Sequence, residues 1–149
     1  MRKGVTEDKA VAADILSRAE VLWLALADAQ GPHCVPVNFA AEGDVVYVHS
    51  GQKGRKAACL DSGAPLAFSA VVDMTLKTSD DNACELGYRF RSVMGNGTPR
   101  ALDGDEKRNA LDLITLKYAG REMPYNEKVL AITAVYAIDV AAVTARVKE

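Results

Sequence analysis

The most chemically suggestive part of the sequence is residues 51–56, Gly-Gln-Lys-Gly-Arg-Lys, which follow an apolar run typical of a strand. Arg55 and Lys56 open a segment with helical character. Unpaired backbone N–H groups and the positive end of a helix favour an anion at such a junction. A guanidinium and an ammonium would add charge-assisted hydrogen bonds suited to a terminal phosphate. A solvated basic helix start is the alternative interpretation. The segment is not a Walker loop, because the spacing GxxxxGK(S/T) is absent.

The cysteines and histidines offer weaker signals for chemistry. Cys34 lies beside His33, which is compatible with a thiol nucleophile or a metal ligand, but a small apolar residue in a strand is the commoner role for cysteine. No CxxC motif occurs, and His33 and His49 are 16 positions apart. The usual paired ligand spacings are therefore missing, and the sequence predicts no structural zinc site and no disulfide framework.

Composition limits the class of protein that can carry these residues. The chain has 149 residues, of which 49% are hydrophobic and 26% charged, as expected for one soluble globular domain spanning residues 1–149. The formal net charge is −2, which does not favour nucleic-acid binding. The longest apolar run, residues 21–27, is far shorter than the roughly 20 residues that span a bilayer. No signal-peptide core follows the N-terminus, so we expect a cytoplasmic protein that does not bind membranes.

The elements that must position these residues follow from periodicity and turn residues. Apolar runs and alternation predict six strands, at residues 21–27, 33–40, 45–49, 65–72, 85–102 and 130–140. Helical spacing and caps predict helices at about residues 6–19, 55–61 and 106–118. Pro36 indicates an edge strand or a bulge, residues 73–82 a polar loop, and Gly95 and Gly97 a break in the fifth strand. This order favours an antiparallel α+β domain, plausibly a barrel.

Several strings, taken in order, resemble the FMN-binding split barrels related to pyridoxamine 5'-phosphate oxidase, and most closely the nitroimidazole-resistance-type flavin proteins. The strings are Val35-Pro36-Val37-Asn38-Phe39, Tyr47-Val48-His49-Ser50, Gly54-Arg55-Lys56, Ala83-Cys84, Tyr88 to Gly97, and Pro124-Tyr125. They cover nearly the whole chain, from about residue 20 to residue 140. The resemblance favours the phosphate interpretation of the basic pair.

The resemblance implies a homodimer of six-stranded split barrels with two FMN sites at its interface. By position in this sequence, it implies that Gly54, Arg55 and Lys56 hold the ribityl phosphate. It also implies that His49 and Ser50 lie beside the flavin, and that the ring is lined by Pro36, Val37 and Asn38. The partner subunit is expected to contribute the positions of Arg91, Ser92 and Val93.

His49 has several possible roles under this resemblance: a structural strand residue, a hydrogen-bond donor at the flavin edge, an acid on the substrate side, or a haem ligand. The C-terminal arginines that clasp the substrate phosphate in the true oxidases have no equivalent here, so we do not expect pyridoxamine-phosphate oxidation. The sequence thus predicts an FMN-dependent oxidoreductase acting on a small organic electron acceptor such as a nitro compound. The alternatives are a non-catalytic flavin- or haem-binding protein, or a dimeric scaffold without flavin.

Overall fold

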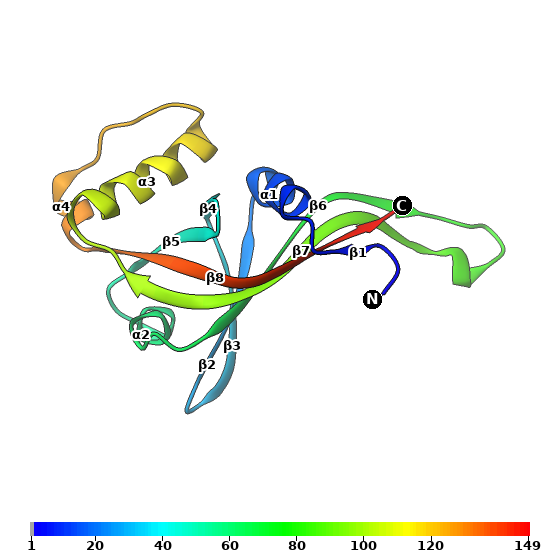
Figure 1. The fold of residues 1–149 in the computed structure, drawn as a ribbon, viewed down its shortest axis with the longest axis horizontal. Helices are drawn as coiled ribbons and strands as arrows, with labels where there is room; N and C mark the ends of the chain where they lie inside the picture. The colour runs from blue at the N-terminus through cyan, green and yellow to red at the C-terminus, as the bar shows by residue number, and fades with distance from the viewer. Residues whose placement is uncertain (1) are drawn as a thin grey trace.

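The computed structural model describes residues 2–149 as an antiparallel sheet with a few flanking helices (Figure 1). The strands are β1 (Val5–Thr6), β2 (Leu22–Asp28), β3 (Gly31–Val37), β4 (Phe39–Glu42), β5 (Val45–Gly51), β6 (Leu66–Lys77), β7 (Gly87–Ala101) and β8 (Thr133–Lys148). The helices are α1 (Lys9–Arg18), α2 (Arg55–Asp61), α3 (Gly104–Ala119) and α4 (Glu127–Ala131), with a 3-10 turn at Ala83–Glu85. The α+β class is confirmed.

The sheet follows the order β3-β2-β6-β7-β8-β5-β4, and β1 pairs with β8 off this path. Only Asn38 separates β3 from β4, so the two ends of the path meet at this residue and the sheet curves into a split barrel. Pro36 lies in β3, which in the described part of the chain pairs with β2 alone, so the edge position expected for this proline is confirmed. The sheet has eight strands rather than six because the predicted second strand divides at Asn38 and β1 adds two residues.

The main core lies between the inner face of the sheet and α1. The helix begins after Asp8, whose side chain accepts a hydrogen bond of 2.8 Å from the backbone N–H of Ala10. Its apolar stripe of Ala12, Ile15 and Leu16 is buried against the sheet. A second, smaller core joins α3 and α4 to the faces of β5 and β8. The helices therefore cover only part of the sheet.

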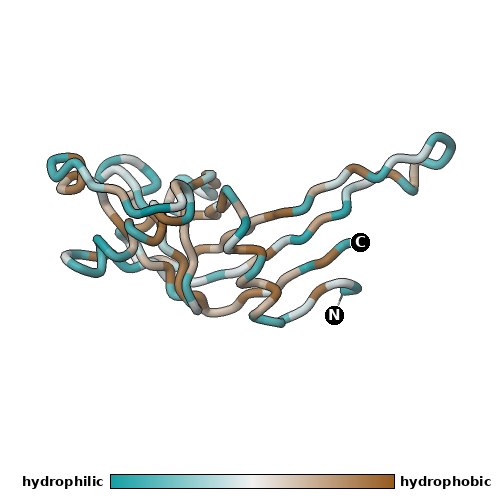
Figure 2. The backbone as a smooth tube through the Cα atoms, turned by 90° about the horizontal axis from the view of Figure 1, so that it is seen from above, coloured by the Kyte–Doolittle hydropathy of each residue, from teal (hydrophilic) through white to brown (hydrophobic). Residues whose placement is uncertain are grey.

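Two long strands form an arm that extends away from the rest of the molecule, as Figures 1 and 2 show. The strand β6 continues to Lys77, so the prediction that residues 73–82 form a loop is wrong for its first five positions. Asp73 stands at an irregularity in the β6–β7 pairing and has a φ of 55°, rare for a residue other than glycine. Most side chains of the arm are exposed on both faces, so its sequence lacks the alternation of apolar and polar residues that would predict a strand.

The predicted break at Gly95 and Gly97 is also wrong, because β7 runs through both residues without interruption. A Cβ at Gly95 would collide with the ring of Phe68, and one at Gly97 with the backbone oxygen of Asp139. These glycines therefore permit close packing inside a continuous strand.

The C-terminal strand was predicted, but with the wrong bounds. It begins at Thr133 rather than at residue 130, and it continues to Lys148 instead of ending at residue 140. The short helix α4 occupies the preceding residues, with the side chain of Asn126 accepting hydrogen bonds from the N–H groups of Lys128 and Val129. An additional residue in β8 opposite Asn96 and Gly97 shifts the register, which interrupts the alternation along the strand.

Candidate functional site

Two of the predicted site residues, Asn38 and His49, lie at the corner where β3 passes into β4. Phe39 pairs with Val48, which places the neighbouring Asn38 next to the end of β5 that carries His49. The end of α3 is fastened to this corner through Tyr118, whose hydroxyl accepts a hydrogen bond of 3.2 Å from the N–H of Phe39 and donates one of 2.7 Å to the carbonyl of Glu20. The corner is therefore held from two sides.

Lys117 reinforces the same attachment. Its ammonium lies 3.4 Å from the centroid of the Phe39 ring and donates a hydrogen bond of 3.0 Å to the carbonyl of Leu16. Burial lowers the pKa of Lys117 to about 8. Nothing in the sequence pattern distinguished this lysine from the other cations of α3.

His49 and Ser50 project to opposite faces of β5, as successive strand residues must. Ser50 is buried, whereas His49 is half-buried at the edge of a hollow of about 340 Å³. The hollow is lined largely by residues of α3 and α4 and of the segment between them: Leu111, Ile114, Thr115, Pro124, Tyr125, Asn126, Val129 and Leu130. Among residues 2–149, no lysine, arginine, aspartate or glutamate lines it, so the imidazole faces a mostly apolar and uncharged space.

Arg55 is already engaged by an acidic residue of another element. Its Nε and Nη2 donate hydrogen bonds of 2.8 and 2.9 Å to the two carboxylate oxygens of Asp28, and Nη2 also donates to the carbonyl of Gly31 at 3.0 Å. The hydrogen bond from Arg55 lowers the pKa of Asp28 to about 2. Among residues 2–149 only Nη1 of this guanidinium makes no hydrogen bond, so Arg55 presents one free nitrogen rather than a fork.

Lys56 is the uncommitted cation of the pair. Its ammonium forms no ion pair within residues 2–149. Gly54, which precedes Arg55, has a φ of 104°, a backbone conformation that favours glycine. The space where a Cβ would lie at this position is open. Burial, and then the charge of Lys56, lower the pKa of His49, which places the lysine and the histidine in one electrostatic environment.

The residues predicted to serve a partner subunit lie elsewhere, on β7. No hydrogen bond or ion pair of residues 2–149 connects Arg91, Ser92 or Val93 with residues 49–56. Val93 is fully buried in the core, so its side chain is not available to a ligand. Arg91 and Ser92 are partly exposed, and Nε of Arg91 lies 3.8 Å from the carboxylate of Asp73.

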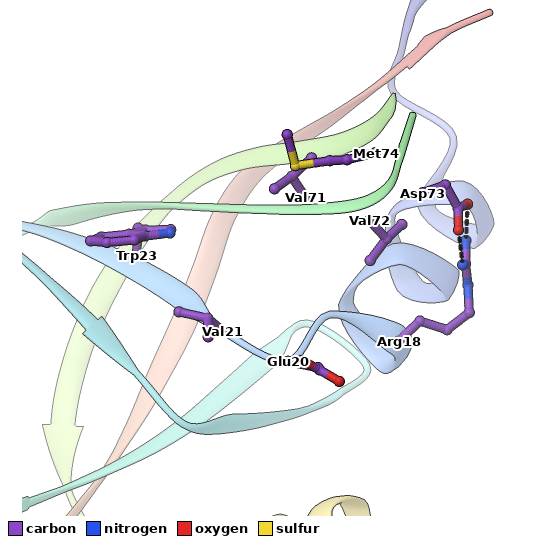
Figure 3. Close-up of a pocket in the computed structure, with 8 residues that line it drawn as sticks. All are labelled: Arg18, Glu20, Val21, Trp23, Val71, Val72, Asp73 and Met74. Atoms are coloured by element: carbon purple, nitrogen blue, oxygen red, sulfur yellow. Dashed lines mark hydrogen bonds and ion pairs between the residues drawn. The ribbon is translucent and has the colours of Figure 1, made fainter. Parts of the chain in front are cut away.

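A second hollow, of about 450 Å³, opens on the outer face of β2 and β6 and is drawn in Figure 3. Its apolar lining includes Val21, Trp23, Val71 and Met74, all exposed. At its end Arg18 and Asp73 are joined by two hydrogen bonds, and Figure 3 shows this pair alongside the apolar side chains. Sequence reasoning missed this surface because residues 21–27 form an unbroken apolar run, which hides the alternation of inward and outward side chains.

Comparison with known proteins places the chain in a family. The family model described as pyridoxamine 5'-phosphate oxidase matches residues 8–147. The chain belongs to this family. The resemblance stated from the sequence is therefore confirmed. A comparison with curated proteins finds no match.

Solved structures support the fold. A putative 5-nitroimidazole antibiotic resistance protein from Bacteroides thetaiotaomicron is 28% identical, with a TM-score of 0.82 over 96% of this chain and 86% of that one. A FAD and haem binding protein from Mycobacterium smegmatis is 22% identical, with a TM-score of 0.87 over 99% and 74% of the two chains. The flavocytochrome Anf3 from Azotobacter vinelandii is 22% identical, with a TM-score of 0.80 over 98% and 70%.

Two other features that could bear on function are a helix able to cross a membrane and a cluster of metal-ligating side chains, and residues 2–149 contain neither. None of the helices in this range combines the length and apolar character that crossing a membrane requires. The same range contains no group of three or more histidine, cysteine, aspartate or glutamate side chains arranged to hold a metal ion.

The partly buried position of His49 leads to a prediction about the pKa of its imidazole. We expect its pKa in the folded protein to lie below 6.5, because burial and the Lys56 charge both disfavour the imidazolium. The unfolded chain then binds the proton more readily, so the contribution of His49 to stability is present above pH 6.5 and is lost as the pH falls below it. An NMR titration of the imidazole carbons measures the pKa directly.

The matched variants Lys56→Gln and Lys53→Gln separate the effect of the Lys56 charge on the pKa of His49 from the effect of burial. Removing the Lys56 charge should raise the pKa of His49, while the change at exposed Lys53 should leave it in place. A pKa of His49 at or above 6.5 in the unmodified protein would contradict the environment described.

Proposed function

We propose that the protein binds FMN at a homodimer interface and transfers electrons to a small organic acceptor such as a nitro compound. The observation that carries this proposal is the ammonium of Lys56, which forms no ion pair within residues 2–149 and whose charge helps to lower the pKa of His49. Membership of the pyridoxamine 5'-phosphate oxidase family supports a flavin as the ligand. The 28% identical nitroimidazole resistance protein supports the class of acceptor.

The residues around Lys56 fit a phosphate group. Lys56 is without a carboxylate partner in the described chain, Nη1 of Arg55 retains two unused hydrogens, and Gly54 leaves its backbone open to close approach. Asp28 offsets part of the positive charge, since it is anionic at neutral pH. We therefore assign the larger electrostatic contribution to Lys56 and a single oriented contact to Arg55.

When bound, the flavin would supply the redox chemistry, and the protein would supply position and electrostatics. The backbone of Pro36, Val37 and Asn38 would lie along the ring, and His49 would face an acceptor in the apolar hollow of α3 and α4. Since the pKa of His49 is lowered, its imidazole is neutral at neutral pH and can donate one hydrogen bond through its N–H. We therefore favour a hydrogen bond from His49 to the acceptor over proton transfer from an imidazolium.

The homodimer is supported by the surface that the helices leave uncovered. On this face of β2, β6 and β7, the large apolar side chains of Trp23, Val71 and Met94 are exposed. Such contiguous apolar surfaces are uncommon on monomers and typical of interfaces. A second copy seated there would bring the arm residues Arg91 and Ser92 toward the partner's ligand.

A second candidate is haem binding at His49. A neutral imidazole facing an uncharged apolar hollow is also the environment of a haem ligand. The FAD and haem binding protein and the flavocytochrome share this fold at 22% identity. In this candidate the protein is a non-catalytic carrier or an electron-transfer protein.

The phosphate assignment predicts how basic residues control affinity. Replacing Lys56 with Ala should raise the Kd for FMN by about tenfold or more, because a charge-assisted contact is lost. Riboflavin lacks the phosphate, so its Kd should not change. Arg55→Ala should have a smaller effect on FMN, since most of its guanidinium is committed to Asp28. Fluorescence titration with both ligands measures these values.

Lys53→Ala is the control for general electrostatics, because Lys53 is an exposed lysine of the same loop. Equal FMN affinity in the protein with and without both Arg55 and Lys56 would reject the phosphate site.

The role of His49 predicts a kinetic effect. With FMN bound and reduced, oxidation by a nitroaromatic compound should be about tenfold or more slower in His49→Ala, which corresponds to a lost hydrogen bond of about 1.4 kcal/mol. Stopped-flow absorbance follows the reaction. Leu116→Ala, on the exposed side of α3, serves as the control. Identical rates in the His49 variant would remove this residue from the mechanism.

An interfacial site predicts that ligand and dimer stabilise each other by mass action. Sedimentation at falling protein concentration should show a lower dimer dissociation constant in saturating FMN than without it. Replacing the interface residue Met94 with Glu should promote dissociation. A dissociation constant that saturating FMN leaves unchanged would place the ligand within one subunit.

A further inference from the structure

We propose that Trp23 is the platform against which the isoalloxazine ring of the flavin stacks. This inference rests on the proposed function and goes beyond it, because it assigns a ring contact to β2, a strand in which neither the motifs nor the family resemblance identified a site residue. The residue is also the chain's only tryptophan.

The strand register brings Trp23 to the predicted ring-binding strand. Trp23 pairs with Pro36, and Leu22 pairs with Val37. Leu22 and Val37 are buried on the inner face, whereas Trp23 and Pro36 are exposed together on the outer face. A planar ligand lying along Pro36 and Asn38 on that face would therefore reach the indole.

The side chains around the indole suit a flat, uncharged aromatic ring. Trp23 is 48% exposed, and the hollow beside it has apolar walls from Val21, Val71 and Met74 (Figure 3). An aromatic ring stacked on the indole would remove this apolar surface from water.

The charged rim favours the ring end of the flavin over its phosphate end. Arg18 and Asp73 neutralise each other through hydrogen bonds of 2.8 and 2.9 Å, so this hollow offers no free cation from that pair. The remaining charged group is Glu20, a carboxylate that forms no ion pair within residues 2–149. A carboxylate accepts hydrogen bonds and repels phosphate, and the isoalloxazine ring carries an imide N–H that would donate to it.

In this arrangement the ring of the flavin lies at one end of the β2–β3 hairpin and its phosphate at the other. Trp23 lies in the first half of β2, and Asp28, which orients Arg55, is its last residue. The two residues are five positions apart in the strand, a distance of about 16 Å. The ribityl chain would run along this hairpin from the basic residues toward the indole.

The variant Trp23→Leu tests the assignment. It should raise the Kd for FMN and for riboflavin by the same factor, about tenfold, because both ligands share the ring and only one carries the phosphate. The fluorescence of the bound isoalloxazine should also increase, because a stacked indole quenches it on contact. Trp23→Phe should restore most of the affinity but little of the quenching.

The control is Leu116→Ala, which removes an apolar side chain of nearly equal exposure, 50%, from the outer side of α3. Thermal unfolding and sedimentation of each variant show whether fold and dimer persist. Unchanged affinity in Trp23→Leu, or a loss for FMN alone, would overturn the ring contact while leaving the flavin site in place. A protein that binds neither FMN nor riboflavin would overturn the proposed function as well. A tryptophan signal that responds to protein concentration and not to flavin would assign the surface to a second copy only.

Discussion

The ion pair between Arg55 and Asp28 fixes one end of the candidate site. Two hydrogen bonds and a third to Gly31 connect the end of the β2–β3 hairpin with the start of α2, elements that the chain separates by more than twenty residues. The neighbouring Lys56 is the charged residue that helps to lower the pKa of His49. The same hairpin carries Trp23 and Pro36, so one ion pair relates the basic residues to the face along which a ring can lie.

Local features of the site were predictable from the sequence, and long-range ones were not. The helix at residues 55–61 and the strand before it follow from apolar periodicity and glycine placement, and the structure has both. The partner of Arg55 could not be predicted, because an aspartate in a turn looks the same whether or not an arginine 27 residues away binds it. Gly95 was interpreted as a break for the same reason: its contact with Phe68 depends on strand pairing.

The remaining differences between the predicted and the observed structure concern which side chains are exposed and which are buried. The apolar run that contains Trp23 gives no sign of which side chains face outward, since every residue in it is hydrophobic. The arm beyond Asp73 lacks an alternating pattern because both of its faces are exposed in the single chain. A surface that binds a ligand or a second copy contains apolar residues that the fold of the single chain leaves exposed. The uncovered face of β2, β6 and β7 has this character.

The central claim is that this member of the pyridoxamine 5'-phosphate oxidase family binds a flavin through Lys56 and the β3–β4 corner. Its most direct test is the visible absorption spectrum of the purified protein after incubation with FMN, FAD or haem and removal of the unbound ligand. The account predicts the two flavin bands with one FMN per chain. A Soret band that is lost in His49→Ala, with no retained flavin, would contradict it and establish haem binding instead.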